Sequence, residues 1–221
     1  MMGFKVLGLD ASGAMLTVGL IEDGHALALF SARLPRAAGS LLVPWISEQV
    51  RWFGKPDGLV VGVGPGSFTG VRVAISTAKA LAWGWNIPVK GVSSLASWAW
   101  AAPVGSRVIV TSERRGSAFY LGDYFRGANG PEPLSPDRAI SGTLPPMFPL
   151  SVAVWVLGPA GDDPALLQQI GPRAEPLDAD LSGVNVALEG WPAVQWGKAD
   201  DPLALVPRYL RAPAVSVRRA R

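Results

Sequence analysis

The first half of the chain alternates between two hydrophobic periods. Short apolar, β-branched runs predict buried strands, and apolar residues spaced three and four apart predict helices. Asp23-Gly24, between the second and third runs, is typical of a hairpin turn. The order of three strands followed by alternating helices and strands predicts an α/β layer. The predicted strands cover residues 5–9, 15–21, 25–32, 59–63 and 87–91, and the predicted helices cover residues 40–53, 71–85 and 94–101.

The first predicted helix starts at a residue that can cap it. The Ser40 hydroxyl can accept a hydrogen bond from the first turn. Pro44 then falls in that first turn, where its missing N–H costs little.

Beyond residue 102 the hydrophobic pattern is weaker. The many prolines and glycines of residues 127–149 predict an irregular loop, and residues 171–202 show no clear period. Ala102-Pro103-Val104-Gly105 is typical of a boundary, so we expect two lobes, residues 1–103 and residues 104–221, with the second reduced. The elements predicted in this half are strands at residues 107–111, 118–125 and 151–157 and a helix at residues 164–170.

The composition excludes several classes of protein. Of the 221 residues, 49% are hydrophobic and 17% are charged, which excludes a disordered chain. The chain has no cysteine and one histidine, His25, so disulfides, thiolate metal sites and sites built on two histidines are excluded, and we expect no metal. No apolar run reaches the ~18 residues of a membrane helix. We therefore expect a cytoplasmic protein that does not contact membranes.

Positive charge is concentrated at the C-terminus. The net charge is +3, and five arginines lie in the last fourteen residues without any acid. The rest of the chain has 15 basic and 17 acidic residues. Such a segment is typical of a solvated terminus or of a contact with nucleic acid or an acidic partner. The five are Arg208, Arg211, Arg218, Arg219 and Arg221.

A glycine-rich loop, residues 64–70, joins a predicted strand to a predicted helix. Its N–H groups can hold an anion at the helix N-terminus. Asp10, at the end of the first predicted strand, can then hold a metal–phosphate complex or act as a base. The loop lacks the lysine of a Walker loop and the third glycine of a dinucleotide fingerprint. A tight, closely packed turn, with Asp10 capping its own turn, is the alternative. The candidate anion-site residues are Asp10, Ser12, Gly64, Gly66, Ser67 and Thr69.

No catalytic set is evident in the sequence. Ser67 lies on a strand-to-helix turn, but the residues around it do not form Gly-x-Ser-x-Gly. His25 follows a hairpin turn, and the aspartate pairs at 162–163 and 200–201 lie beside prolines, as in surface turns. We predict no catalytic residue.

The two long helices of the first lobe are a candidate partner surface. The second helix has a face of mostly small residues, which permits close approach of another helix, and tryptophans lie on both helices, as at interface hot spots. Packing of this face on the protein's own sheet is the alternative. The candidate interface residues are Leu42, Trp45, Gly70, Arg72, Ala74, Thr77, Ala78 and Leu81.

Several motifs together carry a resemblance to a known family. They are Val6-Leu7-Gly8-Leu9-Asp10-Ala11-Ser12, Gly64-Pro65-Gly66-Ser67-Phe68-Thr69-Gly70-Val71-Arg72, Gly91-Val92-Ser93-Ser94-Leu95, Arg114-Arg115-Gly116 and Pro207-Arg208-Tyr209-Leu210-Arg211-Ala212-Pro213. They resemble the TsaB (YeaZ) family, bacterial accessory subunits of tRNA threonylcarbamoyladenosine synthesis. The resemblance covers residues 4–100, parts of 106–125 and residues 205–213. It implies an actin/hexokinase-like (ASKHA, ribonuclease H-like) fold with two related lobes.

The resemblance also implies a function. The implied function is that of a non-catalytic scaffold that binds and activates a TsaD-type threonylcarbamoyltransferase. That enzyme acts on N6 of adenosine 37 in tRNAs reading ANN codons. By itself the chain would not be an enzyme. The implied partners are the TsaD-type subunit, bound through the first-lobe helices, a TsaE-type ATPase, and tRNA indirectly through the complex. A homodimer in isolation, and ATP or ADP at the subunit junction, are left open; no cofactor of its own is implied.

The chain departs from the family at three places. Asp10-Ala11-Ser12 replaces Asp-Thr-Ser, Ala38 stands where the family often has histidine, and Ser112-Glu113-Arg114 replaces a motif beginning Asp-Ala-Arg. These changes argue against independent nucleotide chemistry. The alternative function is a stand-alone ATP-binding enzyme of the same fold, such as a small-molecule kinase; a single histidine disfavours a metalloprotease.

Overall fold

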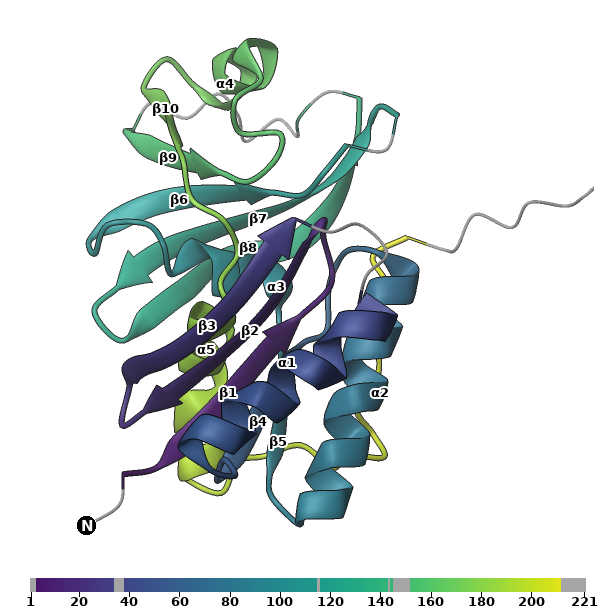
Figure 1. The fold of residues 1–221 in the computed structure, drawn as a ribbon. Helices are drawn as coiled ribbons and strands as arrows, with labels where there is room; N and C mark the ends of the chain where they lie inside the picture. Colours follow the sequence, from purple (N-terminus) through teal and green to yellow (C-terminus); the bar gives the residue numbers. More distant parts are fainter. Residues whose placement is uncertain (1–2, 34–37, 115, 143, 145–151, 212–221) are drawn as a thin grey trace, which may run out of the picture.

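Two five-stranded sheets, each covered by helices, lie one above the other in the computed structural model (Figure 1). The structure describes residues 3–33, 38–114, 116–142, 144 and 152–211. This two-lobed arrangement confirms the predicted α/β class. No helix within these ranges combines the length and the apolar character that crossing a bilayer demands.

The first sheet joins antiparallel and parallel strands in the order β3-β2-β1-β4-β5. β1 pairs antiparallel with β2 and parallel with β4. The predicted hairpin turn is confirmed at Asp23 and Gly24, which both have positive φ. The strands are Lys5–Asp10 (β1), Met15–Glu22 (β2), His25–Arg33 (β3), Gly58–Gly62 (β4) and Val89–Val92 (β5), so all five predicted strands are confirmed.

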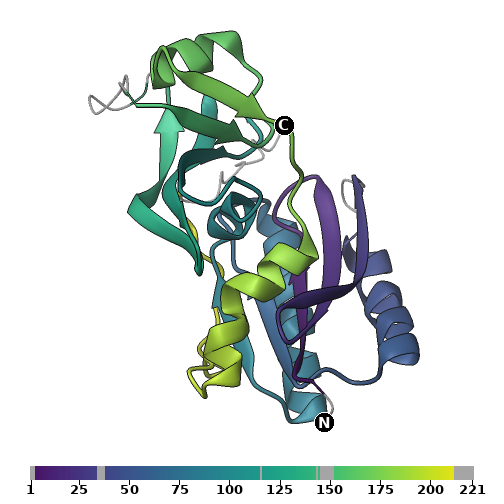
Figure 2. The ribbon, with the colours of Figure 1, turned by 90° about the vertical axis from the view of Figure 1, so that its left-hand side faces the viewer.

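Helices cover both faces of the first sheet. Leu7 and Leu9 of β1 pack in the core beneath α1 (Ala38–Phe53) and α2 (Phe68–Trp85). Val6, one position earlier, packs with α5 (Gly183–Gln195), because successive side chains of a strand point to opposite faces. Figure 2 shows α5 on the face opposite to α1. The central strands are therefore buried on both sides.

Two strand glycines allow α5 to approach this sheet closely. A Cβ at Gly8 would lie 2.2 Å from the Gly183 carbonyl oxygen, and one at Gly19 would lie 2.2 Å from the Val184 nitrogen. Gly183 N also donates a hydrogen bond to Thr17 Oγ1 at 2.7 Å. The start of α5 is therefore fixed on β1 and β2.

The second sheet repeats the strand connections of the first in the order β10-β9-β6-β7-β8. β6, β7 and β8 are antiparallel, and β9 and β10 follow as parallel strands. Helix α3 (Ser94–Ala99) packs on one face, and α4 (Pro164–Ile170) packs with the core of the other face. The strands are Ser106–Thr111 (β6), Ala118–Gly127 (β7), Gly130–Ser141 (β8), Val154–Leu157 (β9) and Ala174–Leu177 (β10).

Two predicted helix starts need correction. α1 begins at Ala38, so Ser40 lies inside its first turn, and Pro44 lies in its second turn rather than its first. α2 begins at Phe68, three residues earlier than predicted, because the Ser67 hydroxyl accepts a hydrogen bond from Gly70 N and caps the helix.

The prediction of an irregular loop over residues 127–149 is wrong for most of its length. Residues 130–141 form β8, whose three prolines are tolerated because β8 is an edge strand. Residues 171–202, predicted to lack a clear period, contain β10 and α5. α5 packs on the first sheet, although the sequence analysis grouped it with the second lobe. Residues 145–151, which include the first residue of the strand predicted at 151–157, lie outside the described ranges.

Candidate functional site

Asp10 ends β1 beneath the glycine-rich loop and is fully buried. Its carboxylate accepts hydrogen bonds from Ser12 N at 2.6 Å and from Ser94 Oγ at 2.5 Å. Burial raises the pKa of the Asp10 carboxyl, and the hydrogen bonds from Ser94 and Ser12 oppose this shift. A Cβ at Gly62 would lie 1.6 Å from Asp10 Oδ2. This geometry favours the alternative in which Asp10 caps its own turn.

The glycine-rich loop uses its N–H groups within the protein. Ser67 N donates to the Ser12 carbonyl oxygen at 2.5 Å. Gly70 N donates to Ser67 Oγ at 3.3 Å, and Gly64 N donates to Ser94 Oγ at 3.2 Å. Three of the N–H groups of the loop are therefore already partnered within the protein.

The remaining loop residues also favour tight packing over an anion cradle. A Cβ at Gly66 would lie 2.2 Å from the Ser12 carbonyl oxygen, and one at Gly70 would lie 1.9 Å from that of Ala11. Thr69 is exposed on the first turn of α2. The glycines thus hold the loop against the residues that follow β1.

The space between this loop and the second lobe is nearly filled. The cavity lined by Ser12, Gly66, Ser94, Glu113 and other residues measures about 30 Å³, room for a water or two, whereas ligand pockets measure roughly 300–1,000 Å³. Glu113 Oε1 accepts a hydrogen bond from Ala14 N at 3.2 Å across this space. In this arrangement of the lobes the cavity is smaller than a nucleotide. Within the described residues, no three His, Asp or Glu side chains are grouped as a metal site requires.

The eight predicted interface residues are not all accessible. Four are buried, and three of these belong to the core between the helices and the first sheet. These four are not accessible in this structure, because Ala74 and Ala78 of α2 and Leu42 of α1 pack in the core against the protein's own sheet and Gly70 packs against Ala11. The buried residues are Leu42, Gly70, Ala74 and Ala78; Trp45, Thr77 and Leu81 are half-buried, and Arg72 is exposed.

Other large apolar side chains are exposed on α1 and α2, which lie side by side on the first sheet (Figure 1). Val43 and Trp52 of α1 are 52% and 70% exposed, and Trp83 of α2 is 87% exposed. The signal for the α1 residues is the helical period, which places them out of phase with the buried Leu42 and Ile46. Large apolar side chains of both helices are therefore accessible away from the buried stripe that packs on the sheet.

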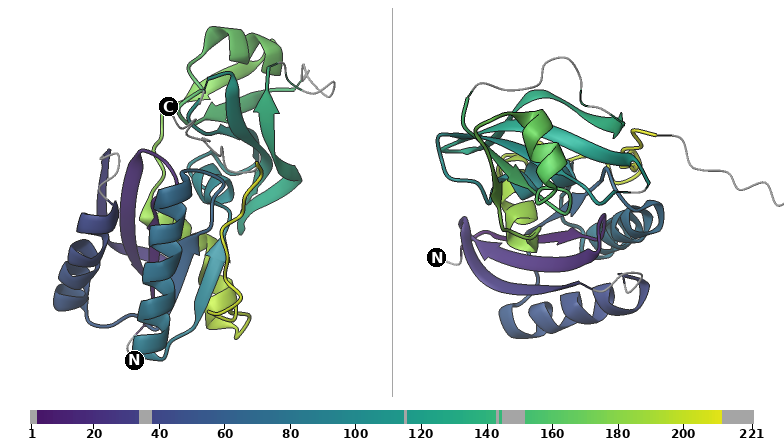
Figure 3. Two further views of the ribbon diagram at one scale, coloured as in Figure 1. Left: turned by 90° about the vertical axis from the view of Figure 1, so that its right-hand side faces the viewer. Right: turned by 90° about the horizontal axis from the view of Figure 1, so that it is seen from above.

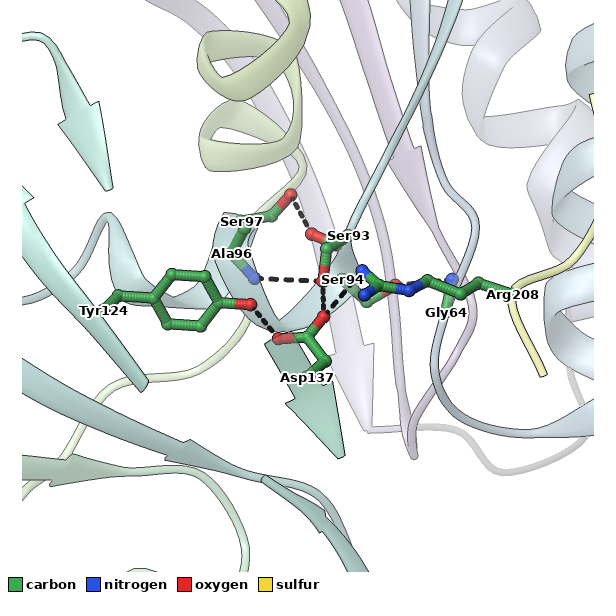
Figure 4. Close-up of polar contacts among 8 residues, drawn as sticks. All are labelled: Gly64, Ser93, Ser94, Ala96, Ser97, Tyr124, Asp137 and Arg208. Atoms are coloured by element: carbon green, nitrogen blue, oxygen red, sulfur yellow. Dashed lines mark hydrogen bonds and ion pairs between the residues drawn. The ribbon is translucent and has the colours of Figure 1, made fainter. Parts of the chain in front are cut away.

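A buried carboxylate links the two lobes at a second place in their junction (Figure 4). Asp137 of β8 accepts hydrogen bonds from Tyr124 Oη, from Ser93 Oγ at 2.6 Å and from Arg208 Nη1 at 2.9 Å. Burial and the neighbouring Asp137 carboxylate raise the pKa of Tyr124, so its hydroxyl remains a donor. No sequence signal marks Asp137, because it lies in the proline-rich stretch that was predicted to be a loop.

Comparison with known proteins relates nearly the whole chain to one family. The chain is 30% identical over 215 residues to an uncharacterized protein of Mycobacterium tuberculosis, with 94% of this chain and 92% of that protein covered. It is 33% identical over 133 residues to "tRNA threonylcarbamoyladenosine biosynthesis protein TsaB" of Escherichia coli, an alignment that covers 57% of each protein. The chain belongs to the TsaB/YeaZ family. The resemblance that the motifs carry is thus confirmed.

The fold of this family is also that of the chain. The solved structure of YeaZ from Pseudomonas aeruginosa matches with a TM-score of 0.81 at 24% identity, over 94% of this chain and all of that chain. The match and the repeated strand order confirm the actin/hexokinase-like fold. The family model described as TsaD, tRNA N6-adenosine threonylcarbamoyltransferase, matches residues 50–129, from the end of α1 to just past β7.

The C-terminal segment (residues 200–211) runs beside β5 (Figure 3). It contains the start of the last family motif, residues 207–213. Asp200 N donates to the Val89 carbonyl oxygen and Arg208 N to that of Val63, both at 2.8 Å. Because Arg208 also bonds Asp137, this segment connects the edge of the first sheet with β8. Residues 212 and 213 lie outside the described ranges, as do the arginines at 218, 219 and 221.

Proposed function

We propose that the chain takes part in tRNA threonylcarbamoyladenosine biosynthesis in the cytoplasm. In this proposal it is a non-catalytic subunit that binds and activates a TsaD-type threonylcarbamoyltransferase acting on adenosine 37. The family membership supports the pathway, because relatives such as the E. coli protein carry this biosynthesis in their name. The TsaD family match over residues 50–129 supports the partner, because homologous lobes can pair through equivalent helices.

The observation that carries the non-catalytic role is the filled space under the glycine-rich loop. A cavity of about 30 Å³ is smaller than a nucleotide requires. Asp10, the candidate metal–phosphate ligand, accepts its hydrogen bonds from Ser12 and Ser94 and is fully buried. The same observation argues against a nucleotide held between the lobes, as a stand-alone ATP-binding kinase would need; a separate space of about 410 Å³ is lined by Ala11, Ser67, Thr69 and Gly70.

The partner surface in this proposal is the outer face of α1 and α2. Trp83 of α2 and, on opposite flanks of α1, Val43 and Trp52 are large apolar side chains that are at least half exposed. Burial of apolar surface is the main favourable term in protein association, and tryptophans are enriched among hot-spot residues. Covering this face therefore provides a physical reason for assembly.

The test is size-exclusion chromatography with light scattering on the chain alone and mixed with its TsaD-type partner. We expect a stable heteromer and expect Trp83→Glu to abolish it while the variant stays folded. Trp196→Glu is the matched control, because Trp196 is 73% exposed at the end of α5, away from the two helices. A wild-type chain that does not associate, even with ATP and a TsaE-type ATPase present, would contradict the proposal.

The same experiment addresses the remaining partners. Adding a TsaE-type ATPase with ATP or ADP tests whether it joins the heteromer and whether a nucleotide at the subunit junction is required. The chain alone reports whether a homodimer forms over the same surface, in which case Trp83→Glu yields a monomer. Formation of modified adenosine only when both proteins are present supports activation of the transferase.

A further inference from the structure

Two aromatic rings and a guanidinium form an exposed stack where the C-terminal segment meets the start of α2. The rings of Phe68 and Tyr209 are stacked with centroids 5.3 Å apart and an interplanar angle of 22°. The Arg72 guanidinium carbon lies 4.8 Å from the centroid of the Phe68 ring. Phe68 is 39% exposed and Tyr209 is 46% exposed. The stack is therefore both ordered and open to solvent.

The protein fixes both halves of this stack. Phe68 and Arg72 lie four residues apart on α2, so their side chains share one face of the helix. Tyr209 follows Arg208, whose N donates to the Val63 carbonyl oxygen and whose side chain bonds Asp137. The stack thus has a fixed position at the junction of the lobes, which lowers the entropic cost of binding a ligand on it.

Apart from Asp200 and Asp201 at the far end of the C-terminal segment, the two segments that form the stack carry cations and no acid. α2 and residues 202–211 contain Arg72, Lys79, Arg208 and Arg211, without any Asp or Glu. Lys79 Nζ donates to the carbonyl oxygens of Leu203 and Leu205, which holds the segments together. In the described part of the chain, Arg208 is paired with Asp137, and Arg72 and Arg211 have no carboxylate partner. The surface around the rings is therefore positive.

Half-exposed aromatic rings with an unpaired arginine packed on one of them, and a second unpaired arginine two residues along the chain from the other, fit single-stranded RNA. Unstacked bases stack on aromatic rings and guanidinium planes, and phosphates bind the neighbouring cations. We propose that Phe68, Tyr209, Arg72 and Arg211 form a direct contact for an unpaired segment of tRNA. The inference rests on the proposed function for its choice of RNA, and it goes beyond that function, in which tRNA is bound indirectly through the complex.

The test measures binding of an unmodified tRNA that reads an ANN codon to the complex of the full chain with its TsaD-type partner, over a range of salt concentrations. We expect Phe68→Ala/Tyr209→Ala to weaken binding about 5- to 150-fold, the effect of losing one stacked base. We expect Arg72→Ala/Arg211→Ala to reduce the slope of log K against log salt by about 1.4, or about 0.7 for each phosphate. Tyr209→Phe retains the ring and should bind as the wild type does.

The control is Arg173→Ala/Trp196→Ala, which removes an exposed arginine and an exposed tryptophan remote from the stack. Light scattering at the same concentrations reports assembly separately.

A variant complex that assembles and binds tRNA with wild-type affinity and salt slope overturns the inference and leaves the proposed function intact. Loss of assembly in the aromatic variant also overturns it, because the rings then belong to the protein interface. If the wild type does not assemble, the proposed function fails, and binding by the isolated chain and its variants decides the inference.

Discussion

Arg208 Nη1 lies 2.9 Å from Asp137 Oδ2, and this ion pair joins the C-terminal segment to β8 across the junction of the lobes. The Asp137 side chain is 2% exposed, whereas that of Arg208 is 41% exposed. Ser93, at the start of α3, and Tyr124, on β7, donate to the same carboxylate. One buried carboxylate therefore connects four segments, which fixes the relative position of the two sheets.

Replacing this carboxylate should destabilise the protein strongly. In Asp137→Ala the hydroxyls of Tyr124 and Ser93 lose their acceptor inside the protein, so we expect the free energy of unfolding to fall by about 2–4 kcal/mol. Urea denaturation measures the change. Asp180→Ala is the control, because the Arg33–Asp180 pair is 57% and 53% exposed and should contribute no more than about 1 kcal/mol. Equal losses in the two variants would argue against a structural role for the network.

Opposite outcomes are expected for two charged substitutions on α2. Ala78 is fully buried against the first sheet, so Ala78→Glu places a charge in the core and should cost several kcal/mol or prevent folding. Trp83 is 87% exposed, so Trp83→Glu should change stability by about 0.5 kcal/mol or less. Thermal unfolding followed by circular dichroism separates the two. An Ala78→Glu protein as stable as the wild type, but unable to assemble, would place the small-residue face at the partner interface.

The elements of the first lobe could be predicted because most of the strands are rich in apolar residues and the two long helices have a clear period. The same rules failed where tertiary position overrides local preference. β8 contains Pro131, Pro133 and Pro136, which a central strand would not tolerate and an edge strand does. α5 contains Gly190 and Pro192, which disfavour helix in isolation, and it is stabilised by packing on the first sheet.

The candidate site was harder to predict because it depends on contacts between residues that are far apart in the sequence. α2 is apolar on most of its surface, so its sequence did not distinguish the face on the sheet, with Ala74 and Ala78, from the outer face with Trp83. The partners of Asp137 are 13 to 71 residues away along the chain, and no local pattern relates residues at such separations. The strand–helix turn itself could be predicted because Gly64 and Gly66 have a local cause there, although residues 68–70 belong to α2.

Two glycines provide a matched test of close packing near the loop. A Cβ at Gly62 would lie 1.6 Å from Asp10 Oδ2, whereas one at Gly84, in the last turn of α2, would have nothing within 4 Å. We expect Gly62→Ala to destabilise the protein by about 1–3 kcal/mol or more, since overpacking forces neighbours to move. Gly84→Ala should stabilise it by up to about 1 kcal/mol, because alanine favours helix. Urea denaturation of both variants measures the difference, and similar values would contradict the packing around Asp10.

Because the Asp10 carboxyl is buried, its ionisation should make the free energy of unfolding depend on pH. A substitution that removes this carboxyl should remove that contribution. Burial raises the pKa of Asp10 in the folded protein above its ordinary value of 3.8. The folded state therefore keeps a proton that the unfolded state has already released, so the free energy of unfolding falls as pH rises through the interval from 3.8 to the folded pKa. The contribution of this group is fully present below pH 3.8 and is lost above its folded pKa.

Asp10→Asn keeps an acceptor for Ser12 N and removes the titration. Urea denaturation from pH 4 upward should thus give a flatter stability curve for the variant than for the wild type, with the variant gaining relative stability as pH rises. Glu189→Gln is the second variant, because burial also raises the pKa of Glu189, and its effect on the slope should add to that of Asp10→Asn. Parallel curves for the wild type and Asp10→Asn would show that Asp10 ionises in the folded protein as readily as in the unfolded chain, and would contradict its placement in a dry, closed turn.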